Sequence, residues 1–219
     1  MLLISGKSYD QFTKRLMDLA MASILILIFI LPSLVIALII KLTSKGPIFA
    51  DVPERVGQYG KKFRMYKFRS MIANAHYLLR TDPKFAKLLR EYKKGSYKLL
   101  NDPRVTPIGK FIRKHSLDEI PQVLNVLRGE MSIIGPRAYY PDELENQQKE
   151  YPHVKGSVAK VLSVKPGITG LWQVTGRSEI NFDERIIIDA KYADRLSLGN
   201  DLKIILKTPW VMLSGKGAV

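Results

Sequence analysis

Two adjacent carboxylates, Asp118 and Glu119, stand where they could act on a phosphate group. They follow the cations Arg113 and Lys114 and open an expected helix with Pro121 in its first turn. Among cations and near a magnesium ion, such an aspartate can attack phosphorus and form an acyl phosphate. The structural alternative is that Asp118 caps the helix and Glu119 complements the helix dipole. The spacing leaves both interpretations open.

Several basic residues are placed where they could bind phosphate. Arg137 follows Gly135-Pro136 and Arg177 follows Gly176, and arginine directly after such turns suits bidentate phosphate binding. A further basic cluster consists of Lys61, Lys62, Arg64, Lys67 and Arg69. A solvated surface is the alternative for each of these cations.

Asp189 is a second unusual carboxylate. At helical spacing it shares a face with Phe182, Ile186 and Ala193. A charge on an apolar face needs a partner. We expect a structural salt bridge, with a substrate or metal contact as the alternative.

The composition excludes several classes of protein. The chain has no cysteine, which rules out disulfides, thiolate zinc sites and cysteine nucleophiles. The histidines show no metal-ligand spacing, and neither common glycine-rich nucleotide motif occurs. Against 20 acidic residues the chain has 35 Lys and Arg, a net charge of +15. This charge predicts an anionic partner: nucleic acid, an acidic membrane surface or a phosphorylated substrate.

An apolar segment precedes the part of the chain that carries these residues. Leu19 to Ile40 runs 22 residues without a charge and has basic residues on both sides. It is long enough to span a bilayer, but Pro32 and Ser33 divide it into halves that are each too short to cross alone. A kinked transmembrane helix is favoured on these features. The alternative is a helix that breaks at Pro32 and returns to the same face, which the basic flanks support.

The remainder predicts one compact domain. From Gly46 onward there are 30 basic and 18 acidic residues, a net charge of +12. We therefore divide the chain into a membrane-inserted part, residues 1–45, and a cytosolic domain, residues 46–219. Periodicity and turn residues predict a strand-like stretch at 62–69, a helix over 70–92 broken at 81–83, a helix over 117–127 closed by Gly129, a polar helix at 142–151, a short strand after 165, and helices at 182–196 and 201–213.

Together these motifs resemble the bacterial sugar transferases, or monotopic phosphoglycosyl transferases. The resemblance covers nearly the whole chain, from about Lys14, with the motifs in the family's order. They are Glu54-Arg-Val-Gly57, Tyr66-Lys-Phe-Arg-Ser-Met71, Ser116-Leu-Asp-Glu-Ile-Pro-Gln122, Ile134-Gly-Pro-Arg137, Lys165-Pro-Gly-Ile-Thr-Gly-Leu-Trp-Gln173 with Gly176-Arg177, and Asp201-Leu-Lys-Ile204.

The resemblance implies a reaction and a catalytic pair. Asp118 would take a sugar-1-phosphate from a UDP-sugar and release UMP, and polyprenyl phosphate would then attack the phosphosugar-enzyme. Mg²⁺ would bind at Asp118 and Glu119, and Glu119 would assist at the metal or in proton handling. The expected substrate-binding residues are Lys67, Arg69, Arg113, Arg137, Arg177 and Asp189.

The resemblance also implies a fold and a location. The resemblance favours a re-entrant helix hairpin, broken at Pro32 and Ser33, over the kinked transmembrane helix. Such a hairpin leaves both termini cytosolic. The expected class is α+β, a mostly helical domain with a small sheet and amphipathic helices on the inner leaflet of the bacterial inner membrane. The chain resembles the family's minimal catalytic form. Anionic inner-leaflet lipids are expected partners, nucleic acid is not, and a homodimer is compatible with the sequence.

Two departures from the family pattern and two alternatives remain. Ala50-Asp-Val-Pro53 replaces a shorter basic stretch, and Ala138 stands where proline usually follows Gly-Pro-Arg.

The reaction would initiate a surface glycan, with hexose or N-acetylhexosamine phosphates the favoured donors. A non-catalytic basic adaptor, or a degenerate scaffold, is the alternative. The adaptor predicts salt-dependent nucleic-acid binding and no loss of function on Asp118→Asn.

Overall fold

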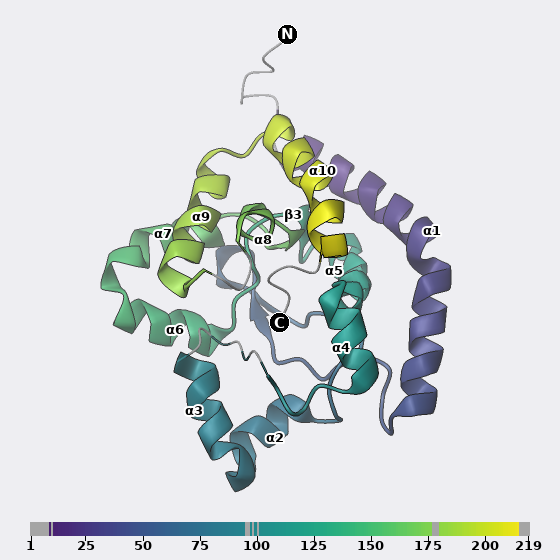
Figure 1. Cartoon of the computed structure of the whole chain (residues 1–219). Helices are drawn as coiled ribbons and strands as arrows, with labels where there is room; N and C mark the ends of the chain where they lie inside the picture. Colours follow the sequence, from purple (N-terminus) through teal and green to yellow (C-terminus); the bar gives the residue numbers. More distant parts are fainter. Residues whose placement is uncertain are drawn as a thin grey trace.

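The chain folds into many short helices and two pairs of short strands (Figure 1). The computed structural model describes residues 9, 11–94, 97, 99, 101–176 and 180–214. The predicted α+β class, mostly helical with little sheet, is confirmed. In chain order the elements are α1 (Gln11–Thr43), β1 (Arg55–Val56), η1 (Gln58–Gly60), β2 (Lys62–Phe63), α2 (Ala75–Thr81), η2 (Pro83–Phe85), α3 (Ala86–Lys94), α4 (Pro107–Lys114), η3 (Leu117–Gln122), α5 (Val123–Leu127), β3 (Ser132–Ile134), α6 (Pro141–Glu150), η4 (Pro152–Val154), α7 (Lys155–Leu162), β4 (Gly167–Thr169), α8 (Leu171–Thr175), α9 (Phe182–Asp194) and α10 (Leu198–Ser214).

The long helix α1 contains the whole apolar segment. Within the described residues it is the one helix long and apolar enough to cross a membrane. The helix continues through Pro32, and its axis bends about midway as it runs along one side of the molecule (Figure 1). The predicted hairpin, broken at Pro32 and Ser33, is not confirmed by this bent helix and stays a prediction. Proline removes one helix hydrogen bond and bends a helix, but the residues on both sides stay helical.

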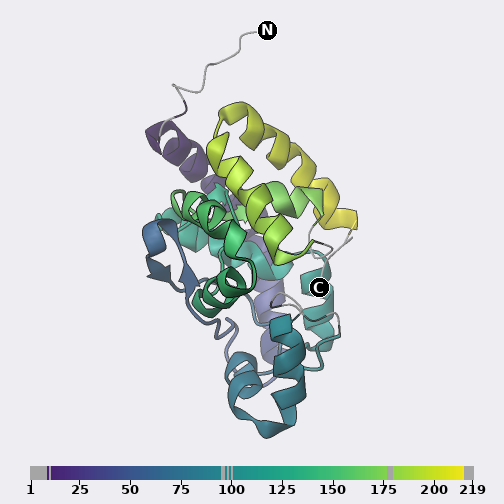
Figure 2. The same ribbon diagram turned by 90° about the vertical axis from the view of Figure 1, so that its left-hand side faces the viewer.

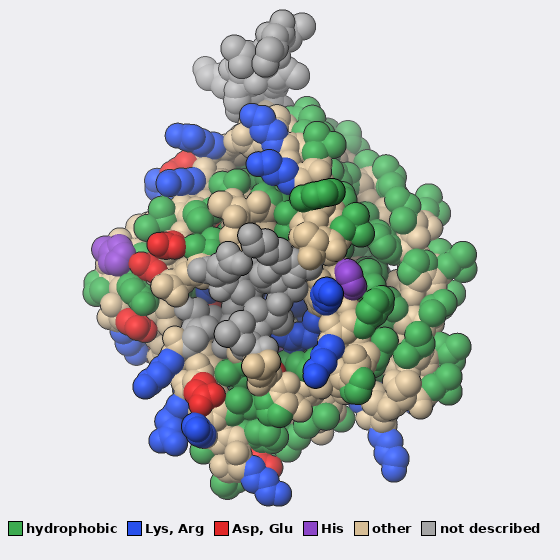
Figure 3. All heavy atoms as spheres, in the orientation of Figure 1, with side chains coloured by type: hydrophobic (Ala, Val, Ile, Leu, Met, Phe, Trp, Pro, Cys, Tyr) green, Lys and Arg blue, Asp and Glu red, His purple; other side chains and the backbone are tan. Residues whose placement is uncertain are grey.

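Contacts with the rest of the chain hold α1 near both ends of its apolar segment. At the first end, the carboxylate of Asp18 accepts a hydrogen bond of 2.9 Å from the Ser132 hydroxyl in β3. At the other end, Ile40 is buried in a cluster with Phe68 and Ile112. The outer face of α1 is uncovered, and apolar side chains gather along that edge of the molecule (Figure 3). One side of α1 therefore packs on the domain while the other needs an apolar environment.

The two strand pairs are separate. β1 and β2 are antiparallel, whereas β3 and β4 are parallel. The strand expected over 62–69 ends after two residues. Beyond that point the amide of Tyr66 donates to the Asn125 side chain at 2.9 Å, and the amide of Phe68 donates to the backbone oxygen of Asp118 at 2.9 Å. These bonds replace a continuous ladder and bring this segment against η3.

Turn chemistry fixes the predicted helix ends. The helix expected over 70–92 is interrupted, as predicted, where Asp82 accepts a hydrogen bond from the Lys84 amide and Pro83 opens η2. Gly129, after α5, has φ of 77°, a left-handed conformation that glycine adopts without strain. α2 and α3 form an arm at one end of the molecule, seen from a second side in Figure 2.

Candidate active site

The carboxylate of Asp118 lies on η3, directly after α4. Ser116 holds the position before η3 with φ of 54°, and the chain there turns sharply out of α4. The capping interpretation of Asp118 is therefore wrong, because Ser116 occupies the cap position. Asp118 is instead a buried residue inside the short helix, with its side chain on the wall of a cavity.

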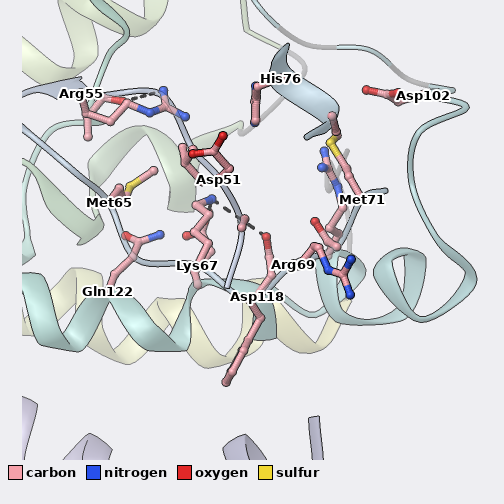
Figure 4. A pocket seen from close by; sticks show the side chains of 18 of the residues that line it. Asp51, Arg55, Met65, Lys67, Arg69, Met71, His76, Asp102, Asp118 and Gln122 are labelled. Atoms are coloured by element: carbon pink, nitrogen blue, oxygen red, sulfur yellow. Dashed lines mark hydrogen bonds and ion pairs between the residues drawn. The ribbon is translucent and has the colours of Figure 1, made fainter. Parts of the chain in front are cut away.

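Lys67 binds both carboxylates of the predicted pair. Its Nζ lies 2.6 Å from Glu119 Oε1 and 4.0 Å from Asp118 Oδ2. Burial raises the pKa of Asp118 above its ordinary value, and the Lys67 ammonium opposes that rise. Figure 4 shows Lys67 and Asp118 pointing toward one another. A cation held here can stabilise the carboxylate form and also meet an incoming phosphate.

This pair lies on the wall of a cavity of about 250 Å³. Of the predicted substrate-binding residues, Lys67, Arg69, Arg113 and Arg137 line it. Other lining residues that bear on its chemistry are Asp51, Arg55, His76, Tyr92, Tyr97, Arg104, Tyr140, Gly167, Trp172 and Gln173. In Figure 4, Lys67 and Asp118 lie close together, and His76 lies farther away, beyond Asp51. A cavity with cations on several walls suits a ligand with more than one phosphate.

Arg69 lines the cavity, but two of its guanidinium nitrogens bond other parts of the chain. Its Nη2 donates to the backbone oxygen and to the hydroxyl of Ser44, both at 2.9 Å, and Nη1 donates to the backbone oxygen of Lys45. These acceptors follow the C-terminal end of α1, where a cation is favourable. Arg69 thus holds the end of α1, and its predicted contact with substrate stays a prediction.

Asp189 is buried and bonded to the segment that carries Arg137. Its Oδ2 accepts hydrogen bonds from the Arg137 amide at 3.0 Å and from the Tyr139 hydroxyl at 2.9 Å. The expected salt bridge is wrong in the described part of the chain, because these neutral donors, not a cation, bond the carboxylate. Burial raises the pKa of Asp189 to about 7. Its Oδ1 lacks a hydrogen-bond partner among the described residues. The position of Arg137 therefore depends on Asp189.

Arg177 and the residues after it, to 179, lie outside the described residues. The structure places Arg137 with its guanidinium 5.6 Å from the ring centroid of Trp172, on the cavity wall. Of the predicted site residues, it brings together Asp118, Glu119 and Lys67 directly, and Arg113 and Arg137 around the same cavity.

Arg55 and His76 line the cavity and were not predicted as site residues. The guanidinium of Arg55 lies 3.3 Å from the ring centroid of Tyr140 and donates to the backbone oxygen of Ala138 at 3.1 Å. Burial, with the charge of Arg55, lowers the pKa of His76 to about 3. The signal for Arg55 was its place in Glu54-Arg-Val-Gly57. His76 has no distinguishing pattern in the sequence.

The carboxylates fit a magnesium ion better than a metal that needs a closed site. Among the described residues no group of three or more His, Cys, Asp or Glu side chains could hold a metal ion. Asp118 and Glu119 supply two carboxylates beside the cavity. Magnesium commonly binds one or two carboxylates and takes its other ligands from water and substrate phosphates. The donor set therefore fits the ion in the presence of a phosphorylated substrate.

Several known proteins are similar to this chain over most of its length. The chain is 42% identical over 217 residues to the undecaprenyl-phosphate galactose phosphotransferase of Salmonella typhimurium, covering 97% of the chain and 43% of that protein. It is 41% identical over 212 residues to the UDP-glucose:undecaprenyl-phosphate glucose-1-phosphate transferase of Klebsiella pneumoniae, covering 94% of the chain and 41% of that protein.

A shorter relative is matched over most of its length. The exopolysaccharide production protein ExoY of Rhizobium meliloti is 38% identical over 202 residues, covering 92% of the chain and 86% of that protein. The chain spans less than half the length of the Salmonella and Klebsiella relatives. The family model for bacterial sugar transferases matches residues 9–215. The chain belongs to the bacterial sugar transferase family.

Proposed function

We propose that the protein transfers a sugar-1-phosphate from a UDP-sugar to polyprenyl phosphate and releases UMP. The observation that carries this proposal is the buried carboxylate of Asp118 beside Lys67 and Glu119 in a cavity lined by further cations. Family membership and the names of the relatives, which specify undecaprenyl phosphate with galactose or glucose, support it. The group that we propose is transferred is therefore the 1-phosphate of an uncharged hexose.

In the first step, an Asp118 oxygen attacks the phosphorus that bears the sugar. The bond between that phosphorus and the oxygen bridging to UMP breaks, and UMP leaves with the bridging oxygen. Lys67 keeps Asp118 available as a carboxylate and lies where it can neutralise charge on the phosphate. Arg113 and Arg137, from other walls of the cavity, are the proposed partners of the remaining phosphate oxygens.

In the second step, an oxygen of polyprenyl phosphate attacks the same phosphorus. The bond between phosphorus and Asp118 breaks, which yields a prenyl diphosphate sugar and restores the carboxylate. Covalent catalysis lets two unlike substrates use one site in turn. The acceptor phosphate is an anion near neutral pH, and the Lys67 ammonium favours the carboxylate form of Asp118, so no separate strong base is part of the proposal.

Magnesium is the proposed cofactor, with Asp118 and Glu119 as its protein ligands. When bound it would offset the negative charge of the diphosphate. Glu119 already bonds Lys67 and so also fixes that cation beside Asp118. Asp189 has a positioning role, since it bonds the backbone amide of Arg137.

The proposed location is the inner face of a bacterial cytoplasmic membrane, with both ends of α1 on that face. The support is that one domain holds α1 at Asp18 and again beyond Ile40, on the two sides of the apolar segment. A helix that crossed the bilayer would carry these ends to opposite faces. α10 adds a second apolar surface, because Leu202, Leu206, Trp210 and Leu213 are all exposed. The +12 domain would be drawn to anionic headgroups.

The test is UMP release from a panel of UDP-sugars, with magnesium and polyprenyl phosphate, in detergent-extracted protein. Wild-type protein is expected to release UMP with a hexose donor, and without acceptor its intact mass should increase by one sugar phosphate. Asp118→Asn should lower the rate by roughly 10³-fold or more and abolish the adduct. The matched control is Asp142→Asn, an exposed carboxylate that pairs with Arg80 at 3.2 Å.

Three results would overturn the proposal. They are a folded wild-type protein that releases no UMP with any donor, an adduct that survives in Asp118→Asn, and activity that is unchanged after magnesium is removed by a chelator. The second result would also reassign the nucleophile to another residue.

A further inference from the structure

A second, smaller cavity lies between α1 and the η3–α5 segment. Its volume is about 190 Å³. Its lining residues are Ile26, Phe29, Ile30, Ser33, Phe49, Phe68, Ile120, Pro121, Val123 and Leu124. We call this cavity the apolar groove. Ser33 supplies its one polar side chain, so the groove has nothing with which to bind a nucleotide, a sugar or a charged peptide.

The α1 side of the groove is a single helical stripe. Its four lining residues, at positions 26, 29, 30 and 33, have the i, i+3, i+4, i+7 spacing of one helix face. Ile30 is still 52% exposed, so this face of α1 is only partly covered by the domain. Neighbouring exposed residues, such as Leu27 and Leu31, continue the apolar surface along the helix. The groove therefore opens onto the part of the molecule that needs an apolar environment.

The opposite side of the groove is the backbone that carries the catalytic pair. Ile120 and Pro121 directly follow Asp118 and Glu119 in η3 and line the groove. Phe68 lines both the groove and the carboxylate cavity. The amide of Phe68 also donates to the backbone oxygen of Asp118 at 2.9 Å. Phe68 is therefore the residue that separates the groove from the proposed site of phosphoryl transfer.

The ring of Phe68 is packed against other side chains. It is stacked on Phe49, with centroids 5.9 Å apart and the ring planes at 6°. Phe68 is buried on the side of Ile40 and Ile112. The part of the groove formed by Phe68 is therefore fixed by packing.

We propose that the apolar groove holds the first isoprene units of the acceptor lipid, those next to its phosphate. This inference rests on the proposed function, which requires a prenyl phosphate to reach Asp118. A molecule with its phosphate at Lys67 and its chain in the groove would pass Phe68 and leave along the exposed face of α1. At about 190 Å³ the groove is smaller than the roughly 300–1,000 Å³ of typical ligand sites, so only a short stretch of the chain fits.

The groove acts on orientation more than on affinity. A prenyl chain leaves one apolar environment, the bilayer, for another, so little hydrophobic free energy is gained. What the groove supplies is a fixed direction for the phosphate that attacks the phosphosugar-enzyme. Misplacement of a reacting group by about 1 Å can cost up to 10²-fold in rate. Filling the groove is therefore expected to slow the second step and to spare the first.

The test compares two substitutions on neighbouring residues of α1. Ser33→Phe fills the groove, whereas Leu34→Phe adds a ring on the lipid-facing side, where Leu34 is 62% exposed and does not line the groove. We expect Ser33→Phe to lower the rate of prenyl diphosphate sugar formation by about tenfold, while the burst of UMP without acceptor stays within about twofold of wild type. Leu34→Phe should leave both steps unchanged. Leu124→Trp, on the opposite wall, is a second filling variant.

A binding readout that needs no turnover completes the test. A prenyl phosphate with a photoreactive group in its first isoprene unit is added to Asp118→Asn protein, and cross-linked peptides are identified by mass spectrometry. Cross-links to residues 29–33 or 120–124 support the proposal. Cross-links confined to α10, or equal loss of the second step in Ser33→Phe and Leu34→Phe, overturn it. Absence of any UMP burst in wild-type protein would instead refute the proposed function, whatever the cross-links show.

Discussion

The carboxylate of Asp18, in the first turns of α1, accepts a 2.9 Å hydrogen bond from the hydroxyl of Ser132 in β3. The same oxygen accepts from the amide of Ile133 at 3.0 Å and lies 3.0 Å from Lys14 Nζ. Lys14 also lies 3.1 Å from the buried carboxylate of Asp201 in α10. Two helices with exposed apolar faces are thus joined to the parallel strand pair through one buried polar network.

Asp18→Leu should destabilise this attachment strongly. The substitution leaves the Ile133 amide without its buried acceptor and removes one carboxylate from Lys14, while the Ser132 hydroxyl keeps only the Ile134 carbonyl oxygen at 2.8 Å. Losses of this kind cost about 3–5 kcal/mol. Asp18→Asn keeps an acceptor and should cost less. Thermal unfolding in detergent measures both. A midpoint for Asp18→Leu equal to that of wild type would mean that the network contributes nothing to the attachment.

Removal of the Lys67 charge should move the acid limb of the pH–rate profile. Burial raises the pKa of Asp118, and Lys67 opposes that rise. In Lys67→Met the pKa of Asp118 rises further, so the carboxylate is lost at a higher pH than in wild type. The acid limb of UMP release in a single turnover should shift upward, whereas Lys67→Arg should keep it near the wild-type position. A lower rate with an unmoved acid limb would show that Lys67 acts only on the substrate.

Asp189→Asn should change how stability depends on pH. The pKa of Asp189 is raised to about 7 from an ordinary value of 3.8, mainly by burial. The folded protein therefore holds this proton more tightly than the unfolded chain, and the wild type loses stability from this group as pH rises from about 4 to about 7. Above about pH 7 the stability contributed by the protonated Asp189 is fully lost. The advantage of Asp189→Asn over wild type in unfolding temperature should grow across this range, and a constant difference would contradict it.

Gly167→Ala should disrupt the parallel strand pair. A Cβ at Gly167 would lie 2.0 Å from the Gly135 amide nitrogen and 2.4 Å from the Thr169 carbonyl oxygen, both backbone atoms that cannot move independently. Overpacking of this kind costs about 1–3 kcal/mol. Gly156→Ala is the control, because a Cβ there meets nothing within 4 Å and the site lies inside α7. That variant should be neutral or more stable by up to about 1 kcal/mol. Equal unfolding midpoints would refute the close approach.

Local features of the fold were predictable from the sequence. Pro83 after Asp82 predicts an interruption of the helix, because proline cannot donate a helix hydrogen bond. Gly129 predicts the end of the helix before it, and it has the left-handed conformation after α5. α9 and α10 begin and end within a few residues of the predicted bounds, since their apolar periodicity is long enough to be unambiguous. Lys67, Asp118 and Glu119 were predicted as site residues, and the structure joins them by ion pairs.

Interactions between distant segments were not predictable. The stretch at 62–69 has strand composition, but its amides find partners at Asn125 and Asp118, which no local pattern reveals. Asp189 was expected to need a cation, whereas an amide and a hydroxyl from another segment bond it. Arg69 belongs to a basic cluster in the sequence that predicts phosphate binding, but its side chain bonds Ser44, just after α1. In each case the partner lies more than 20 residues away in the chain.

The strand pair also limits how the cavity can evolve. Gly167 lines the cavity with backbone alone, and an added Cβ at Gly135 or Gly170 would likewise lie within 2.4 Å of another backbone atom. A side chain added at these glycines would therefore destabilise the strand pair. The far wall, with His76, Tyr92 and others, presents side chains instead. Substitutions that change the shape of the cavity at low cost are therefore expected at the side chains of the far wall, on the α2–α3 arm, rather than at Gly167.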